Sequence, residues 1–255
     1  MCTQATMEHL SKTRFTQPAL FATSIAYLRI LDTMGLRPAV VAGHSVGEYA
    51  ALVAAGALAF RPGLELVAER GKAMEYAGKK NPGRMVAVLG LDVKQVQRVR
   101  DESGVEIANY NGPHQTVIGG SSKAIEAAIK QVRIRGGKAV MLPVEIASHT
   151  SLMHLAKRIM RPLIEQVPID PPKIAFIQNW TGDYARSVDK ITMGLIYQLT
   201  SPVQWDHSIR TMIRDADGAI RITEVGPKEV LTSMNRRVHK DVSSQSAEEV
   251  IFKAA

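Results

Sequence analysis

The segment Gly43-His44-Ser45-Val46-Gly47 has the form G-x-S-x-G, in which small residues on either side of a serine let a strand turn sharply into a helix. Such a turn holds the serine hydroxyl up at its tip, where it can act as a nucleophile. An apolar run typical of a buried strand ends at residue 42, and an alanine-rich helical pattern begins at residue 46. The alternative is an ordinary strand-to-helix turn in which Ser45 only caps the helix.

A serine nucleophile needs a base, and the candidates are seven histidines. His44 adjoins the serine, but neighbours on a sharp turn usually point apart. His149, in the segment IASHTSLM, stands at the start of a predicted helix and is the preferred candidate; a surface histidine that caps this helix is the alternative. An α/β-hydrolase orders its triad as serine, acid, histidine, and no acidic residue between Ser45 and His149 stands out. The pattern therefore gives a serine and a histidine without an evident acid.

The composition excludes several classes of protein. The chain has 255 residues, 45% apolar and 22% charged, which suffices for one large core or a core with a subdomain and excludes disorder. The longest apolar run covers residues 50–60, whereas a membrane-spanning helix needs about 20 residues, so we expect no membrane segment. The net charge of +8 favours an acidic partner. Nucleic acid is not expected, because aromatic residues make up only 5% and no stacking motif, Cys/His finger or basic cluster stands out.

The only cysteine is Cys2, so the sequence predicts no intrachain disulfide and no cysteine-built metal site, and we expect no metal. This cysteine usage suits a reducing compartment. The first fifteen residues carry Glu8, Lys12 and Arg14 without a continuous apolar core, so we expect no secretory signal. Together these features predict a cytoplasmic protein.

The elements that must position the serine and the histidine follow from the period of the apolar residues. A first group surrounds the serine: helix 17–34, strand 38–42, and helices 46–56 and 61–78. A second group follows His149: helix 150–166, strand 173–178, helices 189–199 and 205–215, strand 219–225 and helix 227–239. The three strands predict a parallel sheet, and the polar residues 240–255 are expected to be mobile.

Between these two groups the pattern changes to short elements in the order strand, helix, strand, strand, helix, strand. That order is typical of a ferredoxin-like split βαβ unit, and its length of about sixty residues is usual for an inserted subdomain. The predicted fold class is therefore α/β. An α/β-hydrolase-like parallel-sheet domain would comprise residues 1–83 and 145–255, and a ferredoxin-like subdomain would comprise residues 84–144.

Seven segments resemble those of malonyl-CoA:acyl carrier protein transacylases, in matching order and spacing over nearly the whole chain. They are TQPAL at 16–20, GHSVGEYAALVAAG at 43–56, RGKAM at 70–74, NYNGPHQTVIGG at 109–120, ASH at 147–149, QLTSPVQW at 198–205 and EVGPKEVLT at 224–232. The resemblance implies the fold predicted above and a ping-pong reaction of fatty-acid or polyketide synthesis. In that reaction a serine takes malonyl from coenzyme A and passes it to the phosphopantetheine thiol of acyl carrier protein, without a cofactor.

The resemblance also implies roles for single residues. Ser45 would be the nucleophile, and His149 would be the general base and later the acid. A backbone carbonyl near Gln198 would hold the imidazole in place of a carboxylate, which accounts for the missing acid. Arg70 would bind the free carboxylate of malonyl, since a planar guanidinium offers two parallel hydrogen bonds that a lysine cannot reproduce. The amide of Val46 would supply half of the oxyanion hole.

Three further polar residues match a family fingerprint beside the site: Asn109, Asn111 and Gln115. Hydrogen bonding at turns and strand ends is their alternative role, and none of them is predicted to be catalytic. The resemblance also suggests a role for the positive net charge. Acyl carrier proteins are acidic, so a basic face on this protein would speed its encounter with the carrier.

Two features depart from the family pattern. Family members begin with a strand that ends in a G-Q-G motif, whose glutamine supplies the second oxyanion donor, and this chain holds no G-Q-G. Lys228 stands where the family usually has glycine. Two other functions therefore stay open: a catalytically impaired fragment or module that binds acyl carrier protein, and, from G-x-S-x-G alone, a serine thioesterase or esterase. Methylmalonyl is the alternative acyl group, because a serine at the place of Ser148 also occurs in polyketide acyltransferases that take it.

Overall fold

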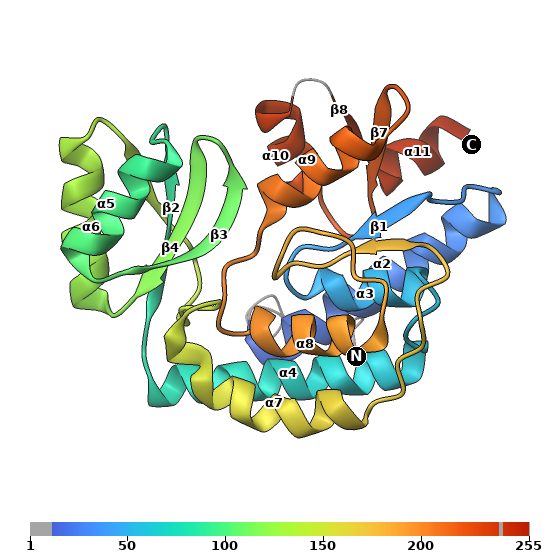
Figure 1. Ribbon diagram of the computed structural model, residues 1–255, viewed down its shortest axis with the longest axis horizontal. Helices are drawn as coiled ribbons and strands as arrows, with labels where there is room; N and C mark the ends of the chain where they lie inside the picture. The colour runs from blue at the N-terminus through green and yellow to red at the C-terminus, as the bar shows by residue number, and fades with distance from the viewer. Residues whose placement is uncertain (1–11, 240–241, 255) are drawn as a thin grey trace.

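The computed structural model describes residues 12–239 and 242–254, and Figure 1 shows how their elements are arranged. Cys2 and Glu8, which bear on the predicted compartment, lie outside these residues. The described residues confirm the predicted α/β class, because helices pack against parallel pairs of strands. Within them, no helix is both long and apolar enough to cross a membrane.

The body that carries Ser45 consists of helices packed around a short parallel pair of strands. β1 (Val40–Ala42) lies beside β6 (Ala175–Ile177), with Val41 opposite Phe176. The helices are α2 (Thr13–Thr33), α3 (Gly47–Ala54), α4 (Phe60–Lys80), α7 (His154–Gln166) and α8 (Val188–Gln198). Each presents an apolar face at helical spacing to one shared core, and α4 and α7 run side by side along the bottom of Figure 1. A short 3-10 turn, Ser151–Met153, leads from His149 into α7.

The segment between these helices forms the separate sheet on the left of Figure 1. Its elements are β2 (Arg84–Leu89), α5 (Val93–Ser103), β3 (Glu106–Gly112), β4 (Gln115–Gly120), α6 (Ser122–Ile134) and β5 (Lys138–Met141). The strands pair antiparallel in the order β3-β4-β2-β5, and α5 and α6 share a core with the sheet. The order of elements is the predicted one, whereas the division of the chain into two domains stays a prediction.

Backbone hydrogen bonds tie this sheet to the main body. Tyr110 N–H donates to the Val203 carbonyl, and Val203 N–H donates to the Ala108 carbonyl, both at 2.9 Å. Val203 stands between the end of α8 and α9 (Trp205–Asp215), so β3 is held directly against the chain that follows Gln198.

The prediction that residues 240–255 are mobile is wrong for the residues that the structure describes. β8 (Val242–Ser246) pairs in parallel with β7 (Ile220–Glu224), and α11 (Ala247–Ala254) follows it. Val242, Ser244 and Ser246 point inward and are buried, but two of these three are serines. Hydropathy therefore did not reveal the strand. Lys240, Asp241 and Ala255 lie outside the described residues.

The helix predicted at residues 227–239 is shorter than expected. α10 (Val230–Val238) begins three residues later. Lys228 has a φ of 68°, in the left-handed region that a right-handed helix excludes, so the helix cannot include it.

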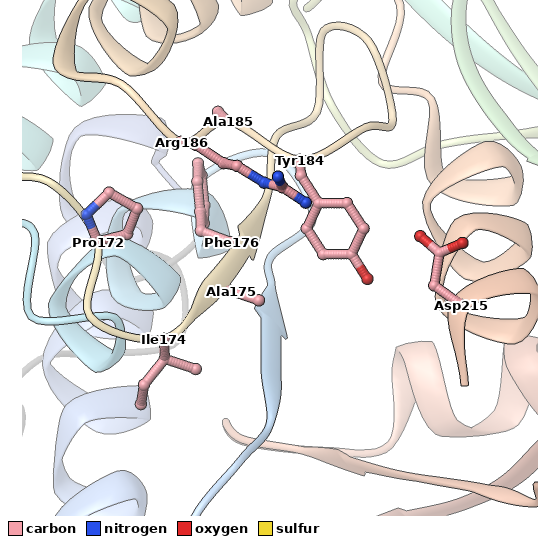
Figure 2. A pocket seen from close by; sticks show the side chains of 8 residues that line it. All are labelled: Pro172, Ile174, Ala175, Phe176, Tyr184, Ala185, Arg186 and Asp215. Atoms are coloured by element: carbon pink, nitrogen blue, oxygen red, sulfur yellow. The ribbon is translucent and has the colours of Figure 1, made fainter. Parts of the chain in front are cut away.

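The three strands predicted for one parallel sheet do not share one. In the described part of the chain, β1 pairs with β6 and β7 with β8, as two separate sheets. The expectation of a buried strand is wrong for β1, which is half-buried and has β6 on one edge and no neighbouring strand among the described residues on the other. Beside β6 lies an open pocket of about 590 Å³, whose lining includes Ala175, Tyr184 and Asp215 (Figure 2). None of the residues predicted for chemistry lines this pocket.

Candidate active site

Ser45 lies in the turn between β1 and α3, in a backbone conformation that residues with a Cβ rarely adopt. Its φ is 53°, and the left-handed conformation costs a non-glycine residue about 1–2 kcal/mol. Two side chains stabilise this turn through hydrogen bonds to the backbone of Ser45. Asn179 Oδ1 accepts a hydrogen bond from Ser45 N–H at 2.6 Å, and Gln198 Nε2 donates to the Ser45 carbonyl at 3.0 Å. The strained turn is therefore fixed on both sides of the reactive side chain.

Ser45 and His149 form the pair that the sequence suggested. Ser45 Oγ lies 2.8 Å from His149 Nε2, and His149 Nδ1 lies 2.7 Å from the backbone carbonyl of Gln198. A carbonyl only accepts, so the imidazole proton lies on Nδ1 and Nε2 is free to accept from the serine hydroxyl. His149 also has a left-handed backbone, with a φ of 63°. The structure thus brings these three predicted residues together, with no acid in the position that a triad would give it.

Burial keeps the imidazole uncharged. The side chain of His149 is almost fully buried, and burial, followed by the positive charge of Arg70, lowers its pKa to about 3. The hydrogen bond to Gln198 opposes this shift only in part. At neutral pH the ring is therefore neutral and ready to accept a proton.

Arg70 reaches the serine from α4 and is 1% exposed. Its Nη2 donates to Ser45 Oγ at 3.2 Å and to Gln198 Oε1 at 2.7 Å, and its Nη1 donates to Gln17 Oε1. Its Nε has no hydrogen-bond partner, and no carboxylate of the described residues forms an ion pair with it. The charge of Glu48 acts on it, but the Gln198 amide lies between the two groups. With a free Nε–H and no carboxylate at ion-pair distance, this guanidinium is suited to an anionic group placed next to the serine.

Three polar residues of this site were missed by the sequence analysis: Gln17, Glu48 and Asn179. Gln17 and Glu48 lie inside two of the segments that carry the family resemblance. The resemblance therefore points to these positions but does not reveal which residues they hydrogen-bond. Asn179 comes two residues after β6, the strand that pairs with β1. Side chains at the carboxyl ends of parallel strands gather at one sheet edge, and that rule would have found it.

The remaining predicted residues lie around this group. His44 points away from the serine, since its Nε2 lies 3.1 Å from Asn111 Oδ1 and its ring meets that of Trp205 edge-on. Asn109 lies on β3 and Gln115 on β4, and the described residues provide no side-chain hydrogen bond for either. Val46 is the N-cap of α3, and its N–H has no acceptor within the described part of the chain. That free N–H is available to a ligand.

The two glycines of G-x-S-x-G differ in what they require. A Cβ on Gly43 would lie 2.0 Å from the Gly47 carbonyl oxygen and 2.5 Å from Glu48 N, which are backbone atoms that cannot move aside. A Cβ on Gly47 would meet nothing within 4 Å. We expect Gly43→Ala to lower the free energy of unfolding by more than ~3 kcal/mol and Gly47→Ala to change it by less than ~1 kcal/mol. Urea denaturation of the two variants checks this, and equal stabilities would contradict the described turn.

No metal centre accompanies this arrangement in residues 12–239 and 242–254, where no group of three or more histidine, cysteine, aspartate or glutamate side chains is placed to hold an ion. The site consists of a serine, a neutral histidine and a buried guanidinium. Such a set can form and break an ester of an acyl group that carries a negative charge.

Comparison with known proteins gives concordant matches over nearly the whole chain. Residues 2–253 match the family described as acyl transferase domain. The malonyl CoA-acyl carrier protein transacylase of Haemophilus influenzae is 36% identical over 254 residues, which are 97% of this chain and 81% of that protein. The solved structure of the malonyl CoA-acyl carrier protein transacylase of Coxiella burnetii superposes with a TM-score of 0.93 at 34% identity, covering 98% of this chain and 81% of that one. A chain from the solved complex of a type II polyketide acyl-carrier protein with its malonyl-transacylase superposes with a TM-score of 0.91 at 34% identity. The match covers 95% of this chain and 80% of that one.

Proposed function

Because the chain belongs to the acyl transferase family, we propose that it transfers a malonyl group from coenzyme A to the phosphopantetheine thiol of an acyl carrier protein. The membership confirms the resemblance that the seven segments indicated. The observation that carries the proposal is the buried guanidinium of Arg70, which donates to Ser45 Oγ and has no carboxylate of the described residues at ion-pair distance. It is placed to bind the free carboxylate of malonyl.

In the first half-reaction, Ser45 Oγ attacks the thioester carbonyl of malonyl-CoA. His149 Nε2, at 2.8 Å, accepts the hydroxyl proton, and the free N–H of Val46 donates to the oxyanion. When the carbon–sulfur bond breaks, the imidazolium returns the proton to the sulfur of coenzyme A. The product is a malonyl ester on Ser45.

The second half-reaction runs the same steps with a new thiol. His149 takes the proton of the phosphopantetheine thiol, and the sulfur attacks the ester carbonyl. The proton then passes to Ser45 Oγ as the carbon–oxygen bond breaks, which regenerates the enzyme. Every proton and electron pair in this scheme belongs to the substrates, Ser45 or His149, so the proposed reaction uses no cofactor.

Arg70 also distinguishes this function from that of a thioesterase or esterase. A neutral acyl chain would leave the buried Nε–H of this guanidinium without a hydrogen-bond partner, which is unfavourable. A malonyl carboxylate can accept two parallel hydrogen bonds from it. The site therefore favours a dicarboxylic acyl group.

The proposed partner is an acidic acyl carrier protein, as in the solved complex of the related transacylase. A net charge of +8 supports the encounter with such a partner. We place the reaction in the cytoplasm, which the use of a single cysteine supports.

Intact-protein mass spectrometry tests the proposal in two steps. The chain is incubated with malonyl-CoA, and we expect a mass gain of one malonyl group. Addition of acyl carrier protein that bears its phosphopantetheine arm should then move this group to the carrier. Folded protein that forms no adduct and loads no carrier would refute the proposal.

A further inference from the structure

Glu48 is a buried carboxylate that the mechanism above does not use. It is 1% exposed, on the first turn of α3, three residues after Ser45. Its Oε1 accepts a hydrogen bond from Asn179 N–H at 2.8 Å, and its Oε2 accepts one from Gln198 Nε2. Both partners are themselves buried, so the three groups form a polar cluster closed off from solvent.

The two partners of Glu48 are the residues that hold the reacting groups. Asn179 accepts from Ser45 N–H at 2.6 Å and donates through Nδ2 to the Gly43 carbonyl. Gln198 contacts the Ser45 carbonyl with its side chain and the imidazole of His149 with its backbone. Each residue that donates a hydrogen bond to Glu48 therefore also contacts the serine turn directly.

Three neighbours set the orientation of the Gln198 amide, and Glu48 is one of them. Gln198 Oε1 faces Arg70, which only donates, and Gln198 Nε2 faces the Glu48 carboxylate and the Ser45 carbonyl, which only accept. A flipped amide would place donor against donor at one end and acceptor against acceptor at the other. Arg70 and the Ser45 carbonyl thus specify a single orientation, and an ionised Glu48 strengthens it by accepting a second hydrogen bond from Nε2.

We propose that Glu48 is a positioning residue for the transfer reaction: its ionised carboxylate fixes Asn179 and the amide of Gln198, and through them the Ser45 turn and Arg70. The proposal rests on the proposed function, because it concerns the rate of the same acyl transfer. It adds a residue that touches neither the substrate nor the reacting atoms.

The geometry predicts a particular dependence on pH. Both oxygens of Glu48 accept from N–H donors, so a proton on either one removes the negative charge and weakens these hydrogen bonds. Burial raises the pKa of Glu48 to about 7, opposed by its two hydrogen bonds and by the charge of Arg70; Tyr49, the next residue on α3, is the other titratable group close to it. The ionised fraction therefore rises as pH increases through 7. His149, with a pKa of about 3, contributes no change in this range.

The test is the single-turnover rate of malonyl ester formation on Ser45, measured from pH 5.5 to 9 by rapid quench and mass spectrometry. For the wild type we expect a rise of roughly 7–20-fold between pH 5.5 and 8, because the ionised fraction of a group with a pKa near 7 increases about 30-fold while the neutral form keeps about 1–10% of the rate. Glu48→Gln places an amide against Gln198 Nε2, so we expect a rate roughly 10–100-fold lower at pH 8 and no rise with pH. Glu48→Asp keeps the charge and should restore the rise.

Glu224→Gln is the matched control. Glu224 also accepts two N–H hydrogen bonds, from Leu231 at 2.9 Å and Thr232 at 2.7 Å, but it caps α10 and contacts none of the site residues. We expect it to keep both the rate and the pH profile of the wild type.

A Glu48→Gln variant that keeps the rise near pH 7, or one as fast as the wild type, would overturn the positioning role. If Glu48→Gln does not fold, the wild-type profile decides alone, because a flat rate from pH 5.5 to 9 also overturns it. A wild type that forms no ester at any pH refutes the proposed function instead, so the two failures are distinguishable.

Discussion

Replacing Ser45 with alanine is expected to abolish the malonyl adduct and to lower transfer to acyl carrier protein by about 10⁴-fold or more. The neutral imidazole of His149, 2.8 Å away, has no other hydroxyl to activate in this position. Intact mass and the rate of carrier loading measure the loss. An adduct that persists in Ser45→Ala would show that another residue carries the acyl group.

Ser45→Gly separates chemistry from folding in the same position. The φ of 53° is unfavourable for serine and alanine alike, but not for glycine. We therefore expect Ser45→Gly to be as inactive as Ser45→Ala and about 1 kcal/mol more stable in urea denaturation. Equal stability of the two variants would contradict the strain assigned to this turn.

Replacing Arg70 with alanine is expected to reduce loading from malonyl-CoA by about 10²–10³-fold relative to loading from acetyl-CoA. Only malonyl presents a carboxylate to the guanidinium, which donates to Ser45 Oγ at 3.2 Å and is 1% exposed. The ratio of the two rates is the quantity to measure, since the loss of Arg70 also leaves Gln17 and Gln198 without their donor and so slows both substrates.

Arg70→Lys is the control for charge. A lysine keeps the positive charge but cannot offer two parallel hydrogen bonds, so we expect it to recover only part of the malonyl preference. Malonyl and acetyl rates that fall by the same factor in Arg70→Ala would assign this residue a structural role. Full recovery in Arg70→Lys would mean that charge alone selects the substrate.

Local patterns predicted most of the secondary structure. The helices and the small sheet have strong periods, so Trp205–Asp215 is found where it was expected and β2 to β5 follow in the predicted order. β8 was missed because its inward side chains include Ser244 and Ser246, which carry no hydropathy signal. The pairing of β1 with β6, and of β7 with β8, depends on contacts between distant segments that no local period encodes.

The candidate site was predicted only where a motif marks it. Ser45 and His149 were found from the G-x-S-x-G turn and the position of the histidine, and Arg70 from the family resemblance. Asn179 and Glu48 lie 131 residues apart in the sequence, and their roles exist only when their side chains meet in a buried cluster. A buried polar residue with distant partners has no signature in its own neighbourhood.

The Gln198 carbonyl that accepts from His149 influences whether a thiol or water takes the acyl group from the serine. A carbonyl carries no full charge, so it stabilises an imidazolium less than the carboxylate of a triad would. Such a weak base is matched to a thiol, with a pKa of about 8.5, far better than to water, with a pKa of about 15.7. We therefore expect the proposed seryl ester to react with the arriving thiol faster than with water.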